Sequence, residues 1–311
     1  MKVGVAVNED LLIPDPAARR RLLDHIAGAG LDHVTTGDHI SFHGGTGFDG
    51  LVSATSVLTA NDTLDMLVGV YLAGLRHPML TARQLATISQ LAPGRLVLGV
   101  GAGGEDRDEI SNAGVDPATR GRRLDETLEI LRRLAAGQTV DHEGRFFSLR
   151  KASILPVPDP PVPLVVGGSG DVAVRRAAAY GDGWLGIFCS ARRFAATVEQ
   201  VRAATAELGR PAPSWFGLNL WCGLGNDGRQ ARDLLDRRLE ALYNLPAEKF
   251  EHVTAAGTPD TVAERLAPYV DAGAEHLTLI VAAESVHDGI DRAAEVRRLL
   301  RAEFAVPRVS G

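Results

Sequence analysis

The chain has 311 residues, of which 45% are hydrophobic and 23% are charged, and its formal net charge is −6 at pH 7. This composition is ordinary for a globular enzyme that buries a large core. Because the charge is negative and no basic stretch occurs, we expect no nucleic-acid partner. The two cysteines, Cys189 and Cys222, lack metal-like spacing. We therefore expect no disulfide framework and a reducing, cytoplasmic compartment.

No segment is apolar over the length that a membrane span needs, and the N-terminal apolar run is shorter than the core of a signal peptide. Instead, short apolar runs alternate with amphipathic stretches. In chain order, this pattern predicts strands at 3–7, 32–36, 64–72, 95–100, 164–166, 183–188, 215–224 and 276–281. It predicts helices at 16–29, 51–61, 78–91, 119–135, 171–180, 191–208, 228–243, 259–272 and 287–302.

Eight strands, each usually followed by a helix, favour an α/β fold of the (β/α)₈ TIM-barrel type; the main alternative is an open, doubly wound sheet. Two segments break the alternation. Residues 141–163 carry a short predicted strand at 145–149 followed by several prolines, and residues 244–257 carry large side chains that indicate a lid or a helical excursion. We interpret both as rim insertions, so residues 1–311 are predicted to form a single barrel domain.

Polar and glycine-rich residues gather where the predicted strands end, which is where barrel enzymes place their active sites. These strand-end residues are Asp38 and His39; Gly69 and Val70; Gly99 to Glu105; Gly167, Gly168 and Ser169; and Gly183 and Trp184. We therefore predict that the functional site lies at the carboxyl ends of the strands.

The run from Gly99 to Gly104 matches the G-x-G-x-x-G pattern of dinucleotide-binding folds. That motif normally leads through a helix to a second strand, but the next forty or so residues look helical throughout. We prefer an interpretation in which the missing side chains let a flat ring approach the backbone. A tight loop that serves only the course of the chain stays as the alternative.

Residues 167–169 stand between a strand and a helix, where backbone N–H groups can bind a phosphate. The Ser169 hydroxyl could cap that helix or donate to the phosphate, and a flexible turn is the simpler alternative. Trp184 could line the cofactor site, although an aromatic residue at a strand start is more often part of the core.

His39 is the leading candidate for proton transfer, since an imidazole titrates near neutral pH. Asp38 could position His39 or contact the cofactor; alternatively, Asp38 caps a turn and His39 simply packs. Glu105 could act as an acid, or belong to a solvated acidic helix start together with Asp106, Asp108 and Glu109. His39 and His43 have the spacing of a helical metal site. The glycines that follow them make a helix improbable there, so we expect no metal.

Taken together and in this order, several segments resemble the bacterial luciferase-like oxidoreductases, which are (β/α)₈ barrels that use FMN or the deazaflavin coenzyme F-420. The resemblance extends over most of the chain. It rests on Gly37-Asp38-His39, Leu75-Arg76-His77-Pro78, residues 94–103, residues 120–126, Gly144-Arg145-Phe146-Phe147, residues 163–168 and residues 177–184.

The resemblance implies roles for matched residues. Asp38 and His39 would contact the ring system, with His39 handling the proton, and the Gly69–Val70 peptide would be cis behind the ring. The remaining cofactor-binding residues would be Gly101 and Gly103 at the ring; Gly167, Gly168 and Ser169 at the phosphate; and Gly183 and Trp184 nearby. Glu105 would be a second catalytic residue, but here Gly104 separates it from the Gly-x-Gly pair that it follows directly in some deazaflavin enzymes.

The implied function is hydride transfer between F-420 and a small organic substrate. An FMN-dependent monooxygenase supplied by a separate flavin reductase is the alternative, and a non-redox barrel that binds a phosphorylated ligand is a further one. Only three of the 33 basic residues are lysines, a bias typical of GC-rich, actinobacterium-like genomes, and this favours F-420. We expect a homodimer. The loops at 40–50, 105–118 and 244–257 are predicted to shape the substrate pocket, where Lys249 is the only lysine.

Overall fold

The computed structural model describes residues 1–8, 11, 13–104 and 106–305. Its main sheet is hydrogen-bonded in the order β9-β11-β1-β2-β3-β4-β7-β8, and a further pairing of β9 with β8 closes the ring. The fold is therefore a (β/α)₈ barrel, and the prediction from the alternating pattern is confirmed. The ring strands are β1 (Lys2–Ala6), β2 (His33–Thr36), β3 (Asp65–Tyr71), β4 (Leu96–Val100), β7 (Leu164–Gly167), β8 (Gly183–Ile187), β9 (Trp215–Leu224) and β11 (His276–Ala282).

The helices follow the strands much as the pattern predicts. They are α1 (Pro16–Gly28), α2 (Gly50–Ala60), α3 (Pro78–Leu91), α4 (Arg107–Asn112), α5 (Arg120–Ala135), α6 (Gly170–Tyr180), α7 (Ala191–Glu207), α8 (Gly228–Tyr243), α9 (Pro259–Asp271) and α10 (Val286–Ala305). The 3₁₀ turns η2 (Ala73–Leu75) and η3 (Ala247–Val253) complete the helical part of the fold. In the part of the chain that the structure describes, no helix combines the length and the apolar character needed to cross a bilayer.

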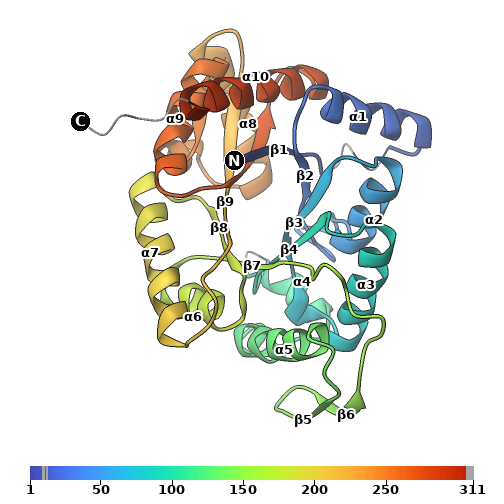
Figure 1. Cartoon of the computed structure of the whole chain (residues 1–311). Helices are drawn as coiled ribbons and strands as arrows, with labels where there is room; N and C mark the ends of the chain where they lie inside the picture. Colours follow the sequence, from blue (N-terminus) through green and yellow to red (C-terminus); the bar gives the residue numbers. More distant parts are fainter. Residues whose placement is uncertain (9–10, 12, 105, 306–311) are drawn as a thin grey trace. The chain divides into compact units, whose positions relative to one another are not determined.

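The chain divides into two compact units. The first comprises Met1–Thr35, Gly186–Gln200 and the chain from Trp215 onward, and the second comprises Thr36–Leu185 and Val201–Ser214. In the second unit, α2, α3 and α5 lie side by side and accompany β3, β4 and β7 (Figure 1). That the two units make one domain over residues 1–311 stays a prediction.

The first predicted rim insertion is an antiparallel hairpin of β5 (Val140–Glu143) and β6 (Ser148–Ala152). The strand predicted at 145–149 is therefore displaced, because residues 144–147 form the turn. The partly buried carboxylate of Glu126 on α5 holds this turn by accepting hydrogen bonds from the Phe146 and Phe147 amides at 2.9–3.1 Å. The second insertion contains the η3 helical turn and the short strand β10 (Ala255–Gly257), which pairs with β9.

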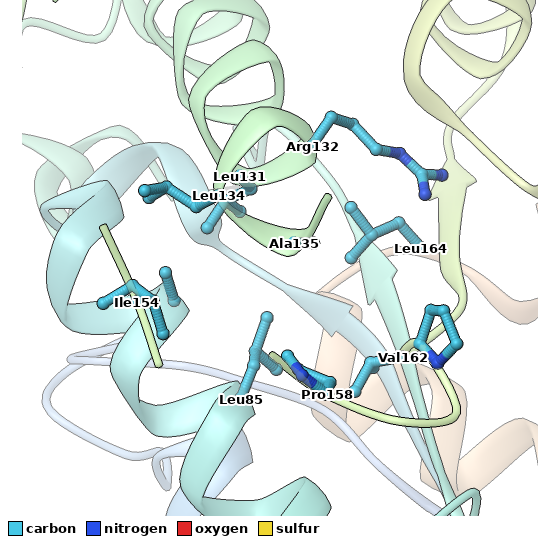
Figure 2. Close-up of a pocket in the computed structure, with 11 residues that line it drawn as sticks. Leu85, Leu131, Arg132, Leu134, Ala135, Ile154, Pro158, Val162 and Leu164 are labelled. Carbon is cyan, nitrogen blue, oxygen red and sulfur yellow. The ribbon is translucent and has the colours of Figure 1, made fainter. Parts of the chain in front are cut away.

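The proline-rich residues that follow the hairpin pack against α3 and α5 and leave an apolar cavity of about 40 Å³, shown in Figure 2. Leu164 lines this cavity and is the first residue of β7. The cavity therefore lies at the amino end of that strand, whereas barrel enzymes bind substrates at the carboxyl ends. We do not place the functional site there.

A polar network is buried within the first unit. The imidazole Nε2 of His33 lies 3.0 Å from the hydroxyl of Thr278, which lies 3.0 Å from the hydroxyl of Thr35. The only side chain that fits beside His33 in β1 is hydrogen, because a Cβ added at Gly4 would overlap the imidazole. The network thus holds a histidine in a site from which water is excluded.

This burial predicts an acid-sensitive fold. Desolvation lowers the pKa of His33 from 6.5 to about 4. Below pH 6.5 His33 is protonated in the unfolded chain but stays mostly neutral in the folded chain until the pH reaches about 4. The free energy of unfolding therefore falls as the pH drops, by roughly 3 kcal/mol at pH 4 from this residue. Urea unfolding at pH 7.5, 6, 5 and 4.5 should show this decline. His33→Gln should make it shallower without abolishing it, because burial also lowers the pKa of His276, to about 3. An unchanged slope in a folded His33→Gln protein would contradict the assignment.

Candidate active site

The carboxylate of Asp38, directly after β2, is completely buried and fully engaged with the protein. It accepts hydrogen bonds from the Gly50 amide at 2.9 Å and the Leu72 amide at 2.8 Å. The guanidinium of Arg76 donates to both carboxylate oxygens at 2.7 and 2.8 Å. These bonds tie the end of β2 to the end of β3 and the start of α2, so Asp38 has a structural role here. That it positions His39 or contacts the cofactor stays a prediction.

Arg76 was not singled out as a site residue from the sequence and was named only within the motif Leu75-Arg76-His77-Pro78. The next two residues of this motif start α3, because His77 caps the helix through its ring nitrogen and Pro78 is the first helical residue. Arg76 also contacts Asp49 at 3.0 Å and lies 4.3 Å from the centre of the Tyr71 ring. Burial by itself would lower the pKa of Arg76, but Asp38 more than offsets this and raises it, so the guanidinium stays charged.

His39 is paired with a buried carboxylate. Its Nδ1 lies 3.2 and 3.3 Å from the two oxygens of Glu109, whose side chain is 4% exposed. Glu109 also accepts hydrogen bonds from the Ile40 amide at 2.6 Å and the Ser41 amide at 3.3 Å. A carboxylate at Nδ1 keeps a proton on that nitrogen. Nε2, which has no partner among the described residues, is therefore left free to take up or release a proton.

The short helix α4 carries Glu109 to His39. Asp106 caps this helix by accepting from the Asp108 and Glu109 amides, and it also accepts from the His43 amide at 2.9 Å. The sequence placed Glu109 only in a solvated acidic stretch and preferred Glu105, which lies outside the described residues. The spacing of Asp106 and Glu109 resembles a capping box, a signal that does not distinguish a cap from a partner for a distant histidine.

Glycines surround the side chain of Val70 at the end of β3. The Gly69–Val70 peptide is cis, as the resemblance predicts. A Cβ added at Gly101 would come within 2.6 Å of a Val70 methyl group, and one at Gly167 within 2.8 Å. These two glycines therefore make room for Val70, which is half-buried. The part of the glycine run after β4 leads into α4 and α5, which fits a barrel loop and not a dinucleotide fingerprint.

Gly103 is exposed and has a φ of +65°, a backbone conformation that favours glycine. Its carbonyl oxygen accepts a hydrogen bond from Nε of Arg120 at 3.1 Å. The first helical residue of α5 thus holds the glycine loop in place.

The loop from Gly167 to Ser169 leads into α6. Ser169 occupies the N-cap position, yet its side chain makes no capping hydrogen bond, and it is exposed. Its hydroxyl and the first amides of α6 are therefore available to an anion. Gly183 is buried in β8 opposite Val165. Trp184 is also buried, and its indole N–H donates to the Gly168 carbonyl at 2.9 Å, so it supports the loop from behind.

The residues brought together at these strand ends belong to one compact unit and suit a ligand with a flat ring and a phosphate. Val70 presents a half-buried apolar surface, the neighbouring positions carry no Cβ, and His39 is a third exposed with Nε2 unengaged. The uncapped start of α6 offers N–H donors for a phosphate. A barrel with polar groups and glycine loops at its strand ends defines the class of (β/α)₈-barrel enzymes.

Within this class, the family is clear. Residues 3–253 match the family model described as luciferase-like monooxygenase. The chain belongs to this family and is an oxidoreductase of the luciferase-like class.

Curated relatives and solved structures agree with this placement. The chain is 29% identical to an F420-dependent glucose-6-phosphate dehydrogenase of Rhodococcus hoagii, over 80% of this chain and 82% of that protein. It is 30% identical to the protein of the same name in Rhodococcus erythropolis, with the same coverage. An F420-dependent secondary alcohol dehydrogenase, solved with an F420-acetone adduct, superposes with a TM-score of 0.83 at 20% identity, covering 96% of this chain and 99% of that chain.

A monooxygenase, RslO1 from Streptomyces bottropensis, superposes with a TM-score of 0.78 at 21% identity over the full length of both chains. At this level of identity the two structural matches establish the shared barrel fold alone.

Proposed function

We propose that the protein transfers hydride between coenzyme F-420 and a small organic substrate. The observation that carries this proposal is the His39–Glu109 pair at the end of β2, which leaves Nε2 of a half-buried histidine free, while the glycine-lined Val70 lies at the end of the neighbouring strand β3. The F420-dependent dehydrogenases among the relatives support the choice of cofactor over FMN.

His39, Val70, Gly101 and Gly103 would hold the ring system, and Gly167, Gly168 and Ser169 would hold the phosphate. Asp38, Gly69, Gly183 and Trp184 would support these contacts from behind. When bound, F-420 supplies a ring carbon that accepts or donates a hydride.

The chain's own residues handle the proton. An alcohol substrate would lose a hydride from its carbinol carbon to the cofactor and its hydroxyl proton to Nε2 of His39, which leaves the carbonyl compound. Glu109 would keep the imidazole in the tautomer that has Nε2 unprotonated and would stabilise the imidazolium that forms.

Cofactor titration followed by fluorescence tests the proposal. We expect F-420 to bind at least about tenfold more tightly than FMN, and Ser169→Ala to weaken F-420 binding about tenfold because a hydrogen bond to a charged group is lost. Ser148→Ala in the β5–β6 hairpin serves as the matched control. Tight FMN binding without a response to F-420 would favour the monooxygenase that depends on a flavin reductase. Binding of neither cofactor would favour a non-redox barrel.

We also propose that the protein acts in the reducing cytoplasm, where its two free cysteines stay reduced, and that it forms a homodimer. Apolar side chains on α2 and α3 support the dimer, since Val52 is 65% exposed and Leu91 is 56% exposed along one groove. Light scattering should report a mass of two chains for the wild type and of one chain for Val52→Glu/Leu91→Glu. A dimer that survives both substitutions would place the interface elsewhere.

A further inference from the structure

Four aromatic side chains meet in the first unit, where β8 and β9 lead into the rim. Phe188 directly follows β8, Trp221 lies in β9, Tyr243 ends α8 and Phe250 lies in η3. The ring centres of Phe188, Tyr243 and Phe250 are 5.2–5.5 Å apart, and that of Trp221 lies 6.1 Å from Tyr243. We call these four residues the aromatic cluster.

The strand register places the cluster on the polar face of the sheet. Trp221 lies opposite Ile280, and two residues earlier Asn219 lies opposite Thr278. Alternate residues of a strand share a face, so Trp221 is on the same face as Thr278 and the buried His33 network. The start of α8 covers this face, because a Cβ at Gly223 would overlap the Ala231 carbonyl. Trp221 also lies in the second half of β9 (Trp215–Leu224), so the cluster lies toward the carboxyl end of this strand, the end at which barrels bind substrates.

Two features of the cluster indicate a ligand. Phe188, Tyr243 and Phe250 are each only half-buried and so present aromatic surface. Trp221 is 4% exposed, and its indole N–H is buried without a hydrogen-bond partner among the described residues. Buried N–H groups are normally paired, so this donor lacks an acceptor that a bound molecule could bring.

The charges around the cluster are unsuited to a phosphate. Its packed neighbours are apolar, including Leu235, Leu239 and Ile280. The exposed side chains that flank Phe250 are two glutamates, Glu248 and Glu251, with Lys249 and His252. An anionic sugar phosphate would thus meet apolar packed neighbours and two carboxylates beside the one lysine.

We infer that the aromatic cluster binds the organic substrate and that this substrate is an uncharged aromatic alcohol or ketone whose oxygen accepts a hydrogen bond from Trp221. This inference rests on the proposed function and names its substrate class. It separates this chain from relatives whose names specify glucose 6-phosphate.

Calorimetry with acetophenone, toluene and glucose 6-phosphate tests the inference on protein with and without F-420. We expect acetophenone to bind and glucose 6-phosphate not to bind. Phe250→Ala should weaken acetophenone binding at least about tenfold, whereas Phe250→Leu, a milder change if the first variant folds poorly, should weaken it less. Phe146→Ala, which removes a half-buried phenylalanine from the β5–β6 hairpin, should leave the affinity unchanged.

Trp221→Phe provides the sharper comparison, because it removes the N–H and retains an aromatic ring. We expect it to weaken the binding of acetophenone but not that of toluene, which has no oxygen. Binding of glucose 6-phosphate, or unchanged acetophenone affinity in folded Phe250→Ala and Trp221→Phe proteins, would overturn the inference. The two proposals can fail separately: acetophenone binding without F-420 binding would refute the cofactor, and the converse would refute the cluster.

Discussion

Replacing His39 with alanine is expected to slow turnover by about 10²- to 10⁴-fold, a larger effect than the accompanying loss of affinity for F-420. This is the usual contribution of a positioned general acid or base. The expectation follows from the free Nε2 and the buried carboxylate behind Nδ1. Steady-state kinetics with the substrate class inferred above, together with cofactor titration, would measure both quantities.

Glu109→Gln refines this test, because Glu109 acts through His39 and is a positioning residue. The amide can no longer stabilise an imidazolium, so we expect a smaller loss of about tenfold in kcat. We also expect a shift in the acid limb of the pH profile of kcat/KM, which a purely structural role would not produce. His43→Ala removes a neighbouring histidine that contacts Asp106 and serves as the control. Unimpaired turnover by His39→Ala would remove His39 from the mechanism.

Replacing Arg76 with methionine is expected to lower the free energy of unfolding by about 3–5 kcal/mol, since it leaves the charge of Asp38 buried without a partner. Asp38 is completely buried and receives two hydrogen bonds from Arg76. The backbone donors Gly50 and Leu72 would remain, but neither neutralises the carboxylate. Urea unfolding followed by circular dichroism would measure the change.

Two variants control this experiment. Asp38→Asn combined with Arg76→Met should recover part of the lost stability, because the buried charge is removed with its partner. Arg83→Met should change stability by less than about 0.5 kcal/mol, since Arg83 makes an exposed contact with the Leu155 carbonyl. A loss below about 1 kcal/mol in Arg76→Met would show that the pair does not hold the strand ends together.

Much of the fold could be predicted from local patterns. The barrel strands lie within a few residues of the predicted apolar runs, because strands and amphipathic helices bury side chains with different periods. The rim insertions were located by their prolines and large side chains, but the turn of the β5–β6 hairpin was misplaced. That turn depends on Glu126, which lies on a separate helix and leaves no local signal at residues 144–147.

The amino-acid sequence by itself determined the barrel class and the strand ends that carry Asp38, His39 and the glycine loops, since both follow from short-range periodicity and composition. The tertiary structure alone decided the partners. Arg76 pairs with Asp38 at a sequence separation of 38 residues, and Glu109 pairs with His39 at a separation of 70. No local sequence pattern connects residues so far apart. Such pairs form only where the fold brings the two side chains together and excludes water, because opposite charges attract more strongly in a less polar environment.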